Sequence, residues 1–240
     1  QWENVRCEAR IVTNNNTIRM NTKQPVTTVD QFGNFERIGP VRLPLRLSND
    51  IISEFQAWYF NFPGGQYTAL VKGSPNLARQ PLVRIESICI WAHLFGSQYC
   101  DCGWQLEEAK RRIHEEGTGM IIFAFDQHGK GVGLRNHFLV YAEGQKRGHE
   151  LVVDSYTSLG FQEDYRTNYR DAAEILNHFN MKQIRLLSNN PMRLKLLQEA
   201  GIEVERVQHE VPLNTYNTQE MVTKKEKLQH LLTLGEHHLP

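Results

Sequence analysis

The second half of this sequence alternates between strand-like and helix-like segments, and that alternation limits the folds open to the chain. Residues 82–90 and 119–126 are apolar runs of strand length, and the second has the unbroken apolar character of a strand covered on both faces. Between them, residues 104–117 carry apolar side chains at helical spacing and end at Gly117. The alternation continues through expected helices at 134–145, 167–181 and 191–201 and an expected strand at 183–190. This pattern predicts a sheet with helices packed on it.

Residues 1–80 have a different character, because they carry short β-type runs separated by Asn, Pro and Gly, at 9–13, 33–47 and 66–73. Together, the two halves predict an α+β fold class, in which a mixed β-sheet is flanked by helices and the N-terminal portion is β-rich. The polar segment 217–232 is helical in pattern, and we expect it on the surface or against a partner.

The composition excludes several classes of protein. Of the 240 residues, 27 are basic and 27 are acidic, so no net field draws the chain to nucleic acid or to an anionic membrane. The longest apolar runs, such as 120–125, are far shorter than a membrane span, and the first residues lack the apolar core of a signal peptide. Four cysteines are too few for a disulfide-stapled secreted fold. We therefore expect a cytoplasmic protein with no nucleic-acid partner and no membrane partner.

Three of the four cysteines lie close together in the sequence, at Cys89, Cys100 and Cys102. Buried free thiols are common, so a purely structural interpretation remains open. Three thiolates without an evident fourth protein ligand are typical of a zinc site with one open coordination position, which a water molecule can fill. His93 is the alternative fourth ligand, and its coordination would close the site and make it structural.

An ordered set of motifs surrounds these cysteines. Arg84, Ser87 and Cys89 form R-x-x-S-x-C, an F-G-S step follows, and the run C-D-C-G-W-Q-L opens the next expected helix. Further along come GVGLRNHFLVYA, LGFQEDYRTNYRDAAEIL, IRLLSNNP and EAGIEVERV. In their order and intervals, these motifs resemble the GTP cyclohydrolase II family over roughly residues 66–235. The resemblance implies one domain over 1–240, with a zinc- and nucleotide-binding catalytic core at 82–235 behind the β-rich portion.

The resemblance also implies a reaction and its catalytic residues. Water attacks C8 of the guanine in GTP or a related purine nucleotide, the imidazole ring opens, formate leaves and pyrophosphate is released. The D-x-R motif places the proton acceptor on Asp164 and the phosphate-attacking arginine on Arg166, and the tyrosine of NHFLVYA is Tyr141. Without the resemblance, Asp164 and Arg166 would be interpreted as a surface ion pair and Tyr141 as a core residue.

Zn²⁺ held by the three cysteines is the implied cofactor, Mg²⁺ at the triphosphate is a second candidate, and a homodimer is the implied assembly. Further positions match substrate contacts of the family: Arg84, Gln105, His128, Lys130, Val152, Ser188 and Arg193. Arg84 at a strand end is suited to bidentate phosphate binding, and Gln105 is expected to face the purine. Ser188 is expected at a strand end, and Arg193 is expected in the first turn of the helix that follows. Backbone N–H groups at such a helix start favour the binding of anions.

Several positions depart from the family pattern. In the loop DQHGKGVGL, His128 stands in place of a carboxylate and Lys130 in place of an arginine, and Val152 replaces a threonine. His93 and Tyr99 also replace charged family residues. Because the departures cluster at the nucleotide, we expect ring opening to persist while phosphate handling or the product changes. The lost carboxylate weakens the case for Mg²⁺. The alternatives are a cyclohydrolase for a different purine nucleotide and a noncatalytic nucleotide-binding module with structural zinc.

Overall fold

The structure is a computed structural model that describes residues 28–32, 34–48, 50–146, 152–161 and 166–234. Its strands are β1 (Thr28–Phe32), β2 (Phe35–Arg46), β3 (Ile52–Phe62), β4 (Gly65–Lys72), β5 (Leu82–Ser87), β6 (Gly119–Ala124), β7 (Gln183–Leu187) and β8 (Glu203–Val207). Its α-helices are α1 (Ile90–His93), α2 (Cys102–Glu116), α3 (Gly133–Lys146), α4 (Val152–Ser158), α5 (Arg166–His178), α6 (Pro191–Glu199) and α7 (Thr218–Leu228). Two short 3₁₀ helices cover Pro75–Leu77 and Phe125–Gln127.

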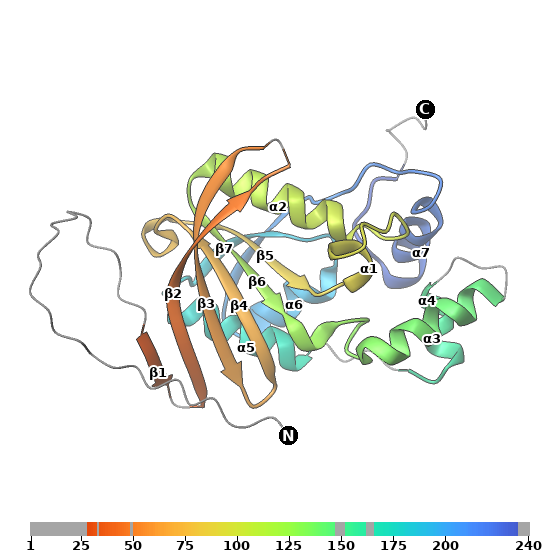
Figure 1. The fold of residues 1–240 in the computed structure, drawn as a ribbon, viewed down its shortest axis with the longest axis horizontal. Helices are drawn as coiled ribbons and strands as arrows, with labels where there is room; N and C mark the ends of the chain where they lie inside the picture. Colours follow the sequence, from red (N-terminus) through yellow and green to blue (C-terminus); the bar gives the residue numbers. More distant parts are fainter. Residues whose placement is uncertain (1–27, 33, 49, 147–151, 162–165, 235–240) are drawn as a thin grey trace, which may run out of the picture.

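One eight-stranded sheet runs through the described chain, in the order β1-β2-β3-β4-β6-β5-β7-β8 (Figure 1). The strands from β1 to β4 pair antiparallel, and β4 joins the second half of the sheet through an antiparallel pairing with β6. From β6 onward the pairings through β5 and β7 to β8 are parallel. The predicted α+β class with a mixed sheet and a β-rich N-terminal part is therefore confirmed.

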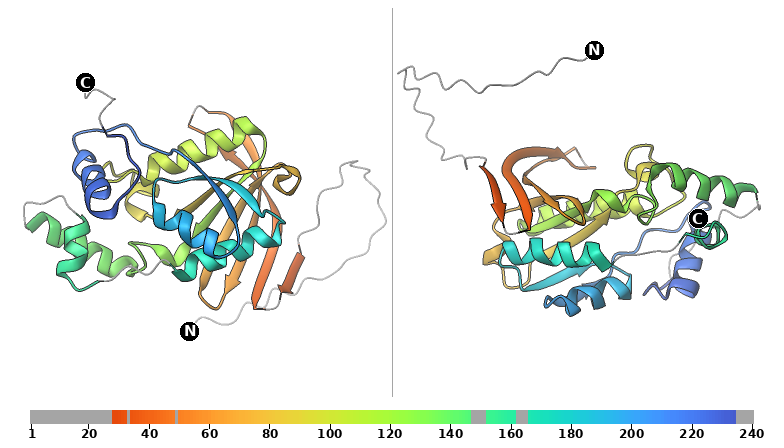
Figure 2. Two further views of the ribbon diagram at one scale, coloured as in Figure 1. Left: turned by 180° about the vertical axis from the view of Figure 1, so that it is seen from behind. Right: turned by 90° about the horizontal axis from the view of Figure 1, so that it is seen from below.

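Helices cover both faces of the sheet, as Figure 2 shows. Ile121 of β6 belongs to a core cluster with the apolar face of α2, which includes Leu106, Ala109 and Ile113. Its neighbours in the strand point the other way, because successive strand residues alternate between faces. Ile122 therefore belongs to a second cluster, which contains apolar residues of α5 and α6. This double burial is the reason why β6 has an unbroken apolar sequence.

The carboxyl ends of the parallel strands β5, β6 and β7 meet at one edge of the sheet. In open α/β sheets, ligands bind outside this edge, because the loops that follow neighbouring strands converge there. The segments that follow are α1, the loop before α3, and the start of α6. In Figure 1, α1, α3, α4 and α7 gather at this end of the sheet, while β1 lies at the far side. The fold therefore places the functional loops together.

Several elements differ from the sequence-based expectation. The strand expected at 82–90 ends at Ser87, and α1 begins at Ile90. The strands β3 and β8 and the helix α4 were not predicted. The segment 217–232 was expected on the surface or against a partner, but Met221 and Thr223 of α7 are buried within the chain. The strand expected at 9–13 lies outside the described residues. Among the described helices, none combines the length and the apolar character that crossing a membrane requires.

Two glycines near the start of β6 give a matched test of the packing. A Cβ on Gly119 (φ +154°) would lie 2.5 Å from the carbonyl oxygen of Leu82 and 3.0 Å from Cγ1 of Ile113. A Cβ on Gly117 (φ +73°), which ends α2, would meet no atom within 4 Å. Gly117→Ala would therefore cost only the strain of a non-glycine residue in left-handed backbone, about 1 kcal/mol. Gly119→Ala would also push two core elements apart.

We expect Gly119→Ala to lower the free energy of unfolding by roughly 3 kcal/mol or more, and Gly117→Ala by about 1 kcal/mol. Urea denaturation of both variants and the wild type measures the difference. Equal losses in the two variants would contradict the close approach of β6 to its neighbours.

Candidate active site

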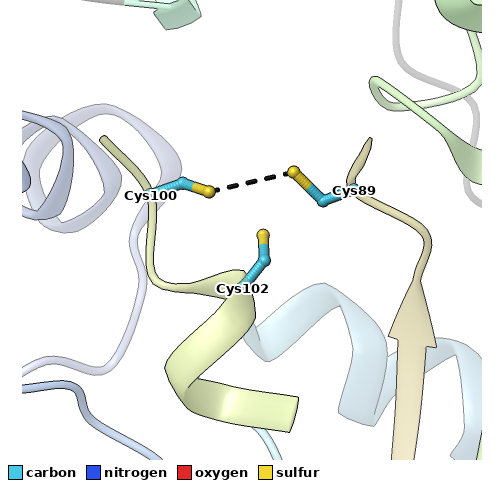
Figure 3. A group of neighbouring side chains, drawn as sticks. All are labelled: Cys89, Cys100 and Cys102. Carbon is cyan, nitrogen blue, oxygen red and sulfur yellow. Dashed lines mark hydrogen bonds between the residues drawn. The ribbon is translucent and has the colours of Figure 1, made fainter. Parts of the chain in front are cut away.

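Three cysteine side chains converge at the carboxyl edge of the sheet (Figure 3). Cys89 follows β5 and immediately precedes α1, Cys100 lies in the loop that leads to α2, and Cys102 is the first residue of α2. Cys89 is buried, while Cys100 and Cys102 are half-buried. Among the described residues, this is the group whose ligand atoms could hold a metal ion.

The spacing of the sulfurs fits a zinc ion. The Sγ atoms of Cys89 and Cys100 are 3.8 Å apart, and all three sulfurs lie within 4.8 Å of one another. Two sulfurs bound at 2.3 Å in tetrahedral geometry would be about 3.8 Å apart. The pKa of Cys89 is raised to about 12, because its contact with Cys100 lowers the value less than the contact with Cys102 and burial raise it. A bound dication would reverse this balance and stabilise the thiolates.

His93 contacts the backbone of the cysteine ligands. Its Nδ1 accepts a hydrogen bond from the backbone N–H of Cys89 at 3.2 Å, so its Nε2 carries the proton of the neutral ring and donates to the carbonyl oxygen of Cys102 at 3.3 Å. The group of three cysteines in the described chain does not include His93. The arrangement therefore does not support the alternative in which His93 is a fourth metal ligand.

A buried ion network connects the cysteine loop to α7. The Oδ1 atom of Asp101 is 2.7 Å from Nζ of Lys224, which is also 2.6 Å from Oε1 of Glu220. Burial alone would raise the pKa of Asp101, but the adjacent Lys224 ammonium brings it below its ordinary value. Burial raises the pKa of Glu220. Asp101 is therefore ionised beside Lys224 in spite of its burial.

Arg84 lies in the middle of β5, so the expectation that it ends the strand is wrong. It is buried, and its guanidinium donates to Glu86 Oε2 at 2.8 Å, to the carbonyl of Leu187 at 2.9 Å and to Gln105 Oε1 at 2.6 Å. The Gln105 amide nitrogen donates to Asp101 at 2.7 Å and to the carbonyl of His209 at 3.2 Å. The oxygen of Gln105 can therefore accept one further hydrogen bond.

A cavity opens beside the three cysteines, and most of the predicted site residues that the structure describes line it. These residues are Arg84, Cys89, Cys100, Cys102, Gln105, Lys130, Tyr141, Ser188 and Arg193. They come from β5, α2, α3, α6 and the loops at the carboxyl edge. The sheet thus brings together segments that are more than a hundred positions apart in the sequence.

Tyr141 of α3 stands between the cysteines and the aromatic wall of the cavity. Its ring centroid is 4.9 Å from Trp91 and 5.1 Å from His137. Burial, followed by the negative charges of Cys100, Glu220, Cys89 and Cys102, raises the pKa of its phenol. The hydroxyl of Tyr141 is therefore protonated at neutral pH and is a hydrogen-bond donor.

The cavity is also lined by cationic side chains. Ser188 follows β7, and Arg193 lies in the first turn of α6, as the sequence predicts. Arg193 donates to the carbonyl of Ile85 at 3.1 Å. The Lys130 ammonium lies 4.7 Å from the ring centroid of Tyr156, a cation–π contact that holds it at the cavity wall. These side chains are suited to an anionic group.

Of the remaining predicted residues, three have side chains that the structure does not describe, and the fourth does not line the cavity. Asp164 lies outside the described residues. Arg166 and Val152 are the first residues of α5 and α4, where only the backbone is described. His128 is buried behind the cavity wall, with its Nε2 at 3.1 Å from Nδ1 of His137. The substrate contact expected of His128 stays a prediction.

The sequence analysis did not identify several residues of the site: Trp91, Asp101, His137, His209, Glu220 and Lys224. One signal was available for His137, because it precedes Tyr141 by four residues on the same helix and must share its face. The ion network had no sequence signal, because Lys224 and Asp101 meet only through the fold.

The structure is that of an α+β protein with three thiols at the carboxyl edge of its parallel strands, at distances that suit a metal ion. The family model for GTP cyclohydrolase II matches residues 41–209, and the chain belongs to this family. The family is one of hydrolases, as the sequence analysis expected. The three-cysteine cluster is consistent with the zinc site typical of the family.

Curated relatives carry the name riboflavin biosynthesis protein RibBA. The protein of Staphylococcus epidermidis is 38% identical over 216 residues, which cover 90% of this chain and 49% of the relative. Those of Staphylococcus haemolyticus and Parabacteroides distasonis are 45% and 42% identical, and each match covers 70% of this chain and 41% of the relative. The chain thus spans about half, or less, of the length of these relatives.

A solved structure of RibBX, a two-domain 3,4-dihydroxy-2-butanone 4-phosphate synthase from A. baumannii, is 18% identical in sequence to this chain. The match covers 74% of this chain and 41% of the RibBX chain. Its TM-score is 0.40, so it supports no inference about this protein.

His209 joins α2 to the loop after β7. Its Nε2–H donates to the backbone carbonyl of Gln105 at 2.9 Å, and its backbone N–H donates to Asn189 Oδ1 at 3.0 Å. Its Nδ1 is buried and has no hydrogen-bond partner in the described chain, so a proton there would have no acceptor. Burial, and then the nearby Arg84, lowers the pKa of His209 to about 3.

This histidine predicts a loss of stability in mild acid. The unfolded chain binds the proton near pH 6.5 and the folded chain near pH 3, so protonation favours unfolding as the pH falls through that window. At pH 5, His209 would lower the free energy of unfolding by roughly 2 kcal/mol relative to pH 7. Urea denaturation at pH 7, 6 and 5 measures the decrease. His209→Gln should show a decrease smaller by that amount, and an identical pH dependence in the variant would contradict the prediction.

Proposed function

We propose that this chain is a zinc-dependent hydrolase that opens the imidazole ring of GTP, or of a closely related purine nucleotide, at C8. The products would be formate, pyrophosphate and a diaminopyrimidinone ribosylamino phosphate, which feeds riboflavin biosynthesis or a specialised purine-derived metabolite. The observation that carries the proposal is the convergence of three thiols on a cavity that cationic residues also line, in a chain of the GTP cyclohydrolase II family.

Zinc, when bound by Cys89, Cys100 and Cys102, supplies a Lewis acid and lowers the pKa of a bound water molecule. The overall reaction consumes one water to open the ring, a second to release C8 as formate and a third to release pyrophosphate. Tyr141 lines the cavity with the thiols and has a protonated phenol, which supports the proposal that it donates a hydrogen bond near C8. Asp164 stays the predicted proton acceptor and Arg166 the predicted phosphate-attacking residue.

The rest of the cavity would orient the nucleotide. The remaining acceptor position of Gln105 is suited to a purine N–H, and Arg193, Ser188 and Lys130 are suited to the phosphates. Three of the five N–H donors of Arg84 are already used within the protein, so its main contribution is to hold Gln105.

Phosphate handling is the part of the reaction most open to change. His128 brings no carboxylate to the loop, and the cavity carboxylates of Glu86 and Asp101 are paired with Arg84 and Lys224. These pairs disfavour Mg²⁺, which binds in proteins through carboxylates. The family homodimer and the cytoplasmic location stay predictions, and light scattering of the purified chain measures the former.

Formate and pyrophosphate should be measured separately after incubation of the full chain with GTP and zinc. We expect stoichiometric formate, with GMP, ATP and ITP as comparison substrates. Formate without pyrophosphate would restrict the activity to ring opening, and formate from another nucleotide alone would reassign the substrate. Release of no formate from any of the four would contradict the proposed hydrolase and leave a noncatalytic nucleotide-binding module.

Substitution of one thiol should reduce metal binding and activity while the fold is retained. Cys100→Ser is expected to lower bound zinc below one ion per chain and to reduce formate release by on the order of a hundredfold or more, because the weaker hydroxyl ligand opens the coordination shell. Cys7→Ser, which changes the one cysteine outside the cluster, is the matched control and should retain both bound zinc and formate release. Zinc content is measured by atomic emission, and full metal retention in Cys100→Ser would contradict the assigned site.

A further inference from the structure

Three rings form a hydrogen-bonded group in the aromatic wall of the cavity: Trp91 of α1, His128 of the loop after β6, and His137 of α3. We call this the Trp–His–His group. Nε1 of Trp91 is 3.1 Å from Nδ1 of His137, and Nε2 of His128 is 3.1 Å from the same Nδ1. The family comparison assigns no role to Trp91 or His137, and only His137 of the three lines the cavity.

The donors in this group determine the tautomer of His137. An indole nitrogen can only donate, so Nδ1 of His137 must be the acceptor and the proton of the neutral ring must be on Nε2. Nε2 of His128 lies 3.1 Å from the same atom, but the single lone pair of that atom already accepts from the indole N–H. Nδ1 of His128 lies 3.4 Å from the backbone N–H of Ile90 and 3.3 Å from the carbonyl oxygen of Ile88, so its contacts suit either tautomer of His128. The tautomer of His137 therefore follows from Trp91.

The position of the His137 ring is also constrained. A Cβ on Gly129 would lie 2.6 Å from Cγ of His137 and 3.0 Å from its Nδ1, so the loop backbone packs against the ring edge. The residue is only 5% exposed and lines the cavity. In the described part of the chain, the hydrogen bonds of His137 all involve Nδ1. Its Nε2–H is therefore the donor that remains for a molecule in the cavity.

Charge indicates which part of a nucleotide this donor suits. Burial, then the neighbouring His128 and Lys130, lowers the pKa of His137 to about 4, so the ring is neutral at pH 7. Phosphate groups bind most strongly to charged donors, which Lys130 and Arg193 provide in the same cavity. A neutral donor held in one orientation is better matched to a neutral acceptor, such as a ring nitrogen or carbonyl oxygen of a purine.

The geometry points to His137 as a substrate-binding residue that donates through Nε2–H to an acceptor atom of the purine base, with Trp91 as the positioning residue that holds its tautomer. This inference deepens the proposed function and takes from it the guanine nucleotide as ligand.

The assignment is tested by measuring the affinity of guanosine for the full zinc-loaded chain by equilibrium dialysis, because guanosine presents the base without phosphates. His137→Phe keeps a ring but removes the donor, so guanosine affinity should fall on the order of tenfold, and the KM for GTP should rise by a similar factor. His137→Gln restores an N–H and should lose less. Unchanged guanosine affinity, or a loss confined to GTP, would overturn the assignment, and the second result would place His137 at the phosphates.

The tautomer is tested directly by ¹⁵N NMR of the histidine rings at pH 7. We expect His137 as the Nε2–H tautomer in the wild type. Trp91→Phe should shift His137 toward a mixture of tautomers and weaken guanosine binding several-fold, while the matched control Trp104→Phe on α2 should change neither. A wild-type His137 protonated on Nδ1 would overturn the inference even if the substituted variants fail to fold.

The two proposals fail in different ways. Guanosine binding that depends on His137, without formate release from any nucleotide, would remove the proposed reaction and keep the binding residue. Normal formate release with an unchanged KM in His137→Phe would keep the reaction and remove the binding residue.

Discussion

The carboxylate of Asp101 lies between the two cysteines of the C-D-C motif, and the rest of the site depends on its being buried and still charged. Lys224 of α7, 2.7 Å away, outweighs the effect of burial and keeps the pKa of Asp101 low. The other carboxylate oxygen accepts from Gln105, whose own oxygen accepts from Arg84 in the centre of the sheet. One charge therefore ties the cysteine loop to β5 and to α7. A buried carboxylate without this cation would be strongly destabilising.

Two parts of the site differ in how closely they follow the family pattern. Around the thiols, the three cysteines, the R-x-x-S-x-C strand and the helix start are all present. In the loop after β6, a histidine stands where the resemblance leads one to expect a carboxylate. Nε2 of that residue, His128, lies 3.1 Å from Nδ1 of His137, which accepts from Trp91. The thiol group and the altered loop therefore belong to different segments of the fold.

Hydrophobic period and turn residues predicted the long elements of the second half within a few residues. α2 covers 102–116 where 104–117 was expected, because its apolar stripe and Gly117 are both local signals. β3 was missed because its central residues are half-buried and do not alternate cleanly. β8 was missed because its side chains are half-exposed and polar, as the pairing with a single neighbour permits. The burial of α7 was missed because its polar residues Glu220 and Lys224 face a cavity and a buried carboxylate instead of water.

The sequence by itself determined the α+β class, the three thiols as a metal-type group and the chemical character of the residues around them, because each of these follows from local spacing and residue type. The tertiary structure decided which side chains meet. Sulfurs 3.8 Å apart, the pairing of Asp101 with Lys224 across 123 positions, and the tautomer of His137 all arise where parallel strands end at one edge. Such contacts join residues that no local pattern relates, so only the folded chain defines them.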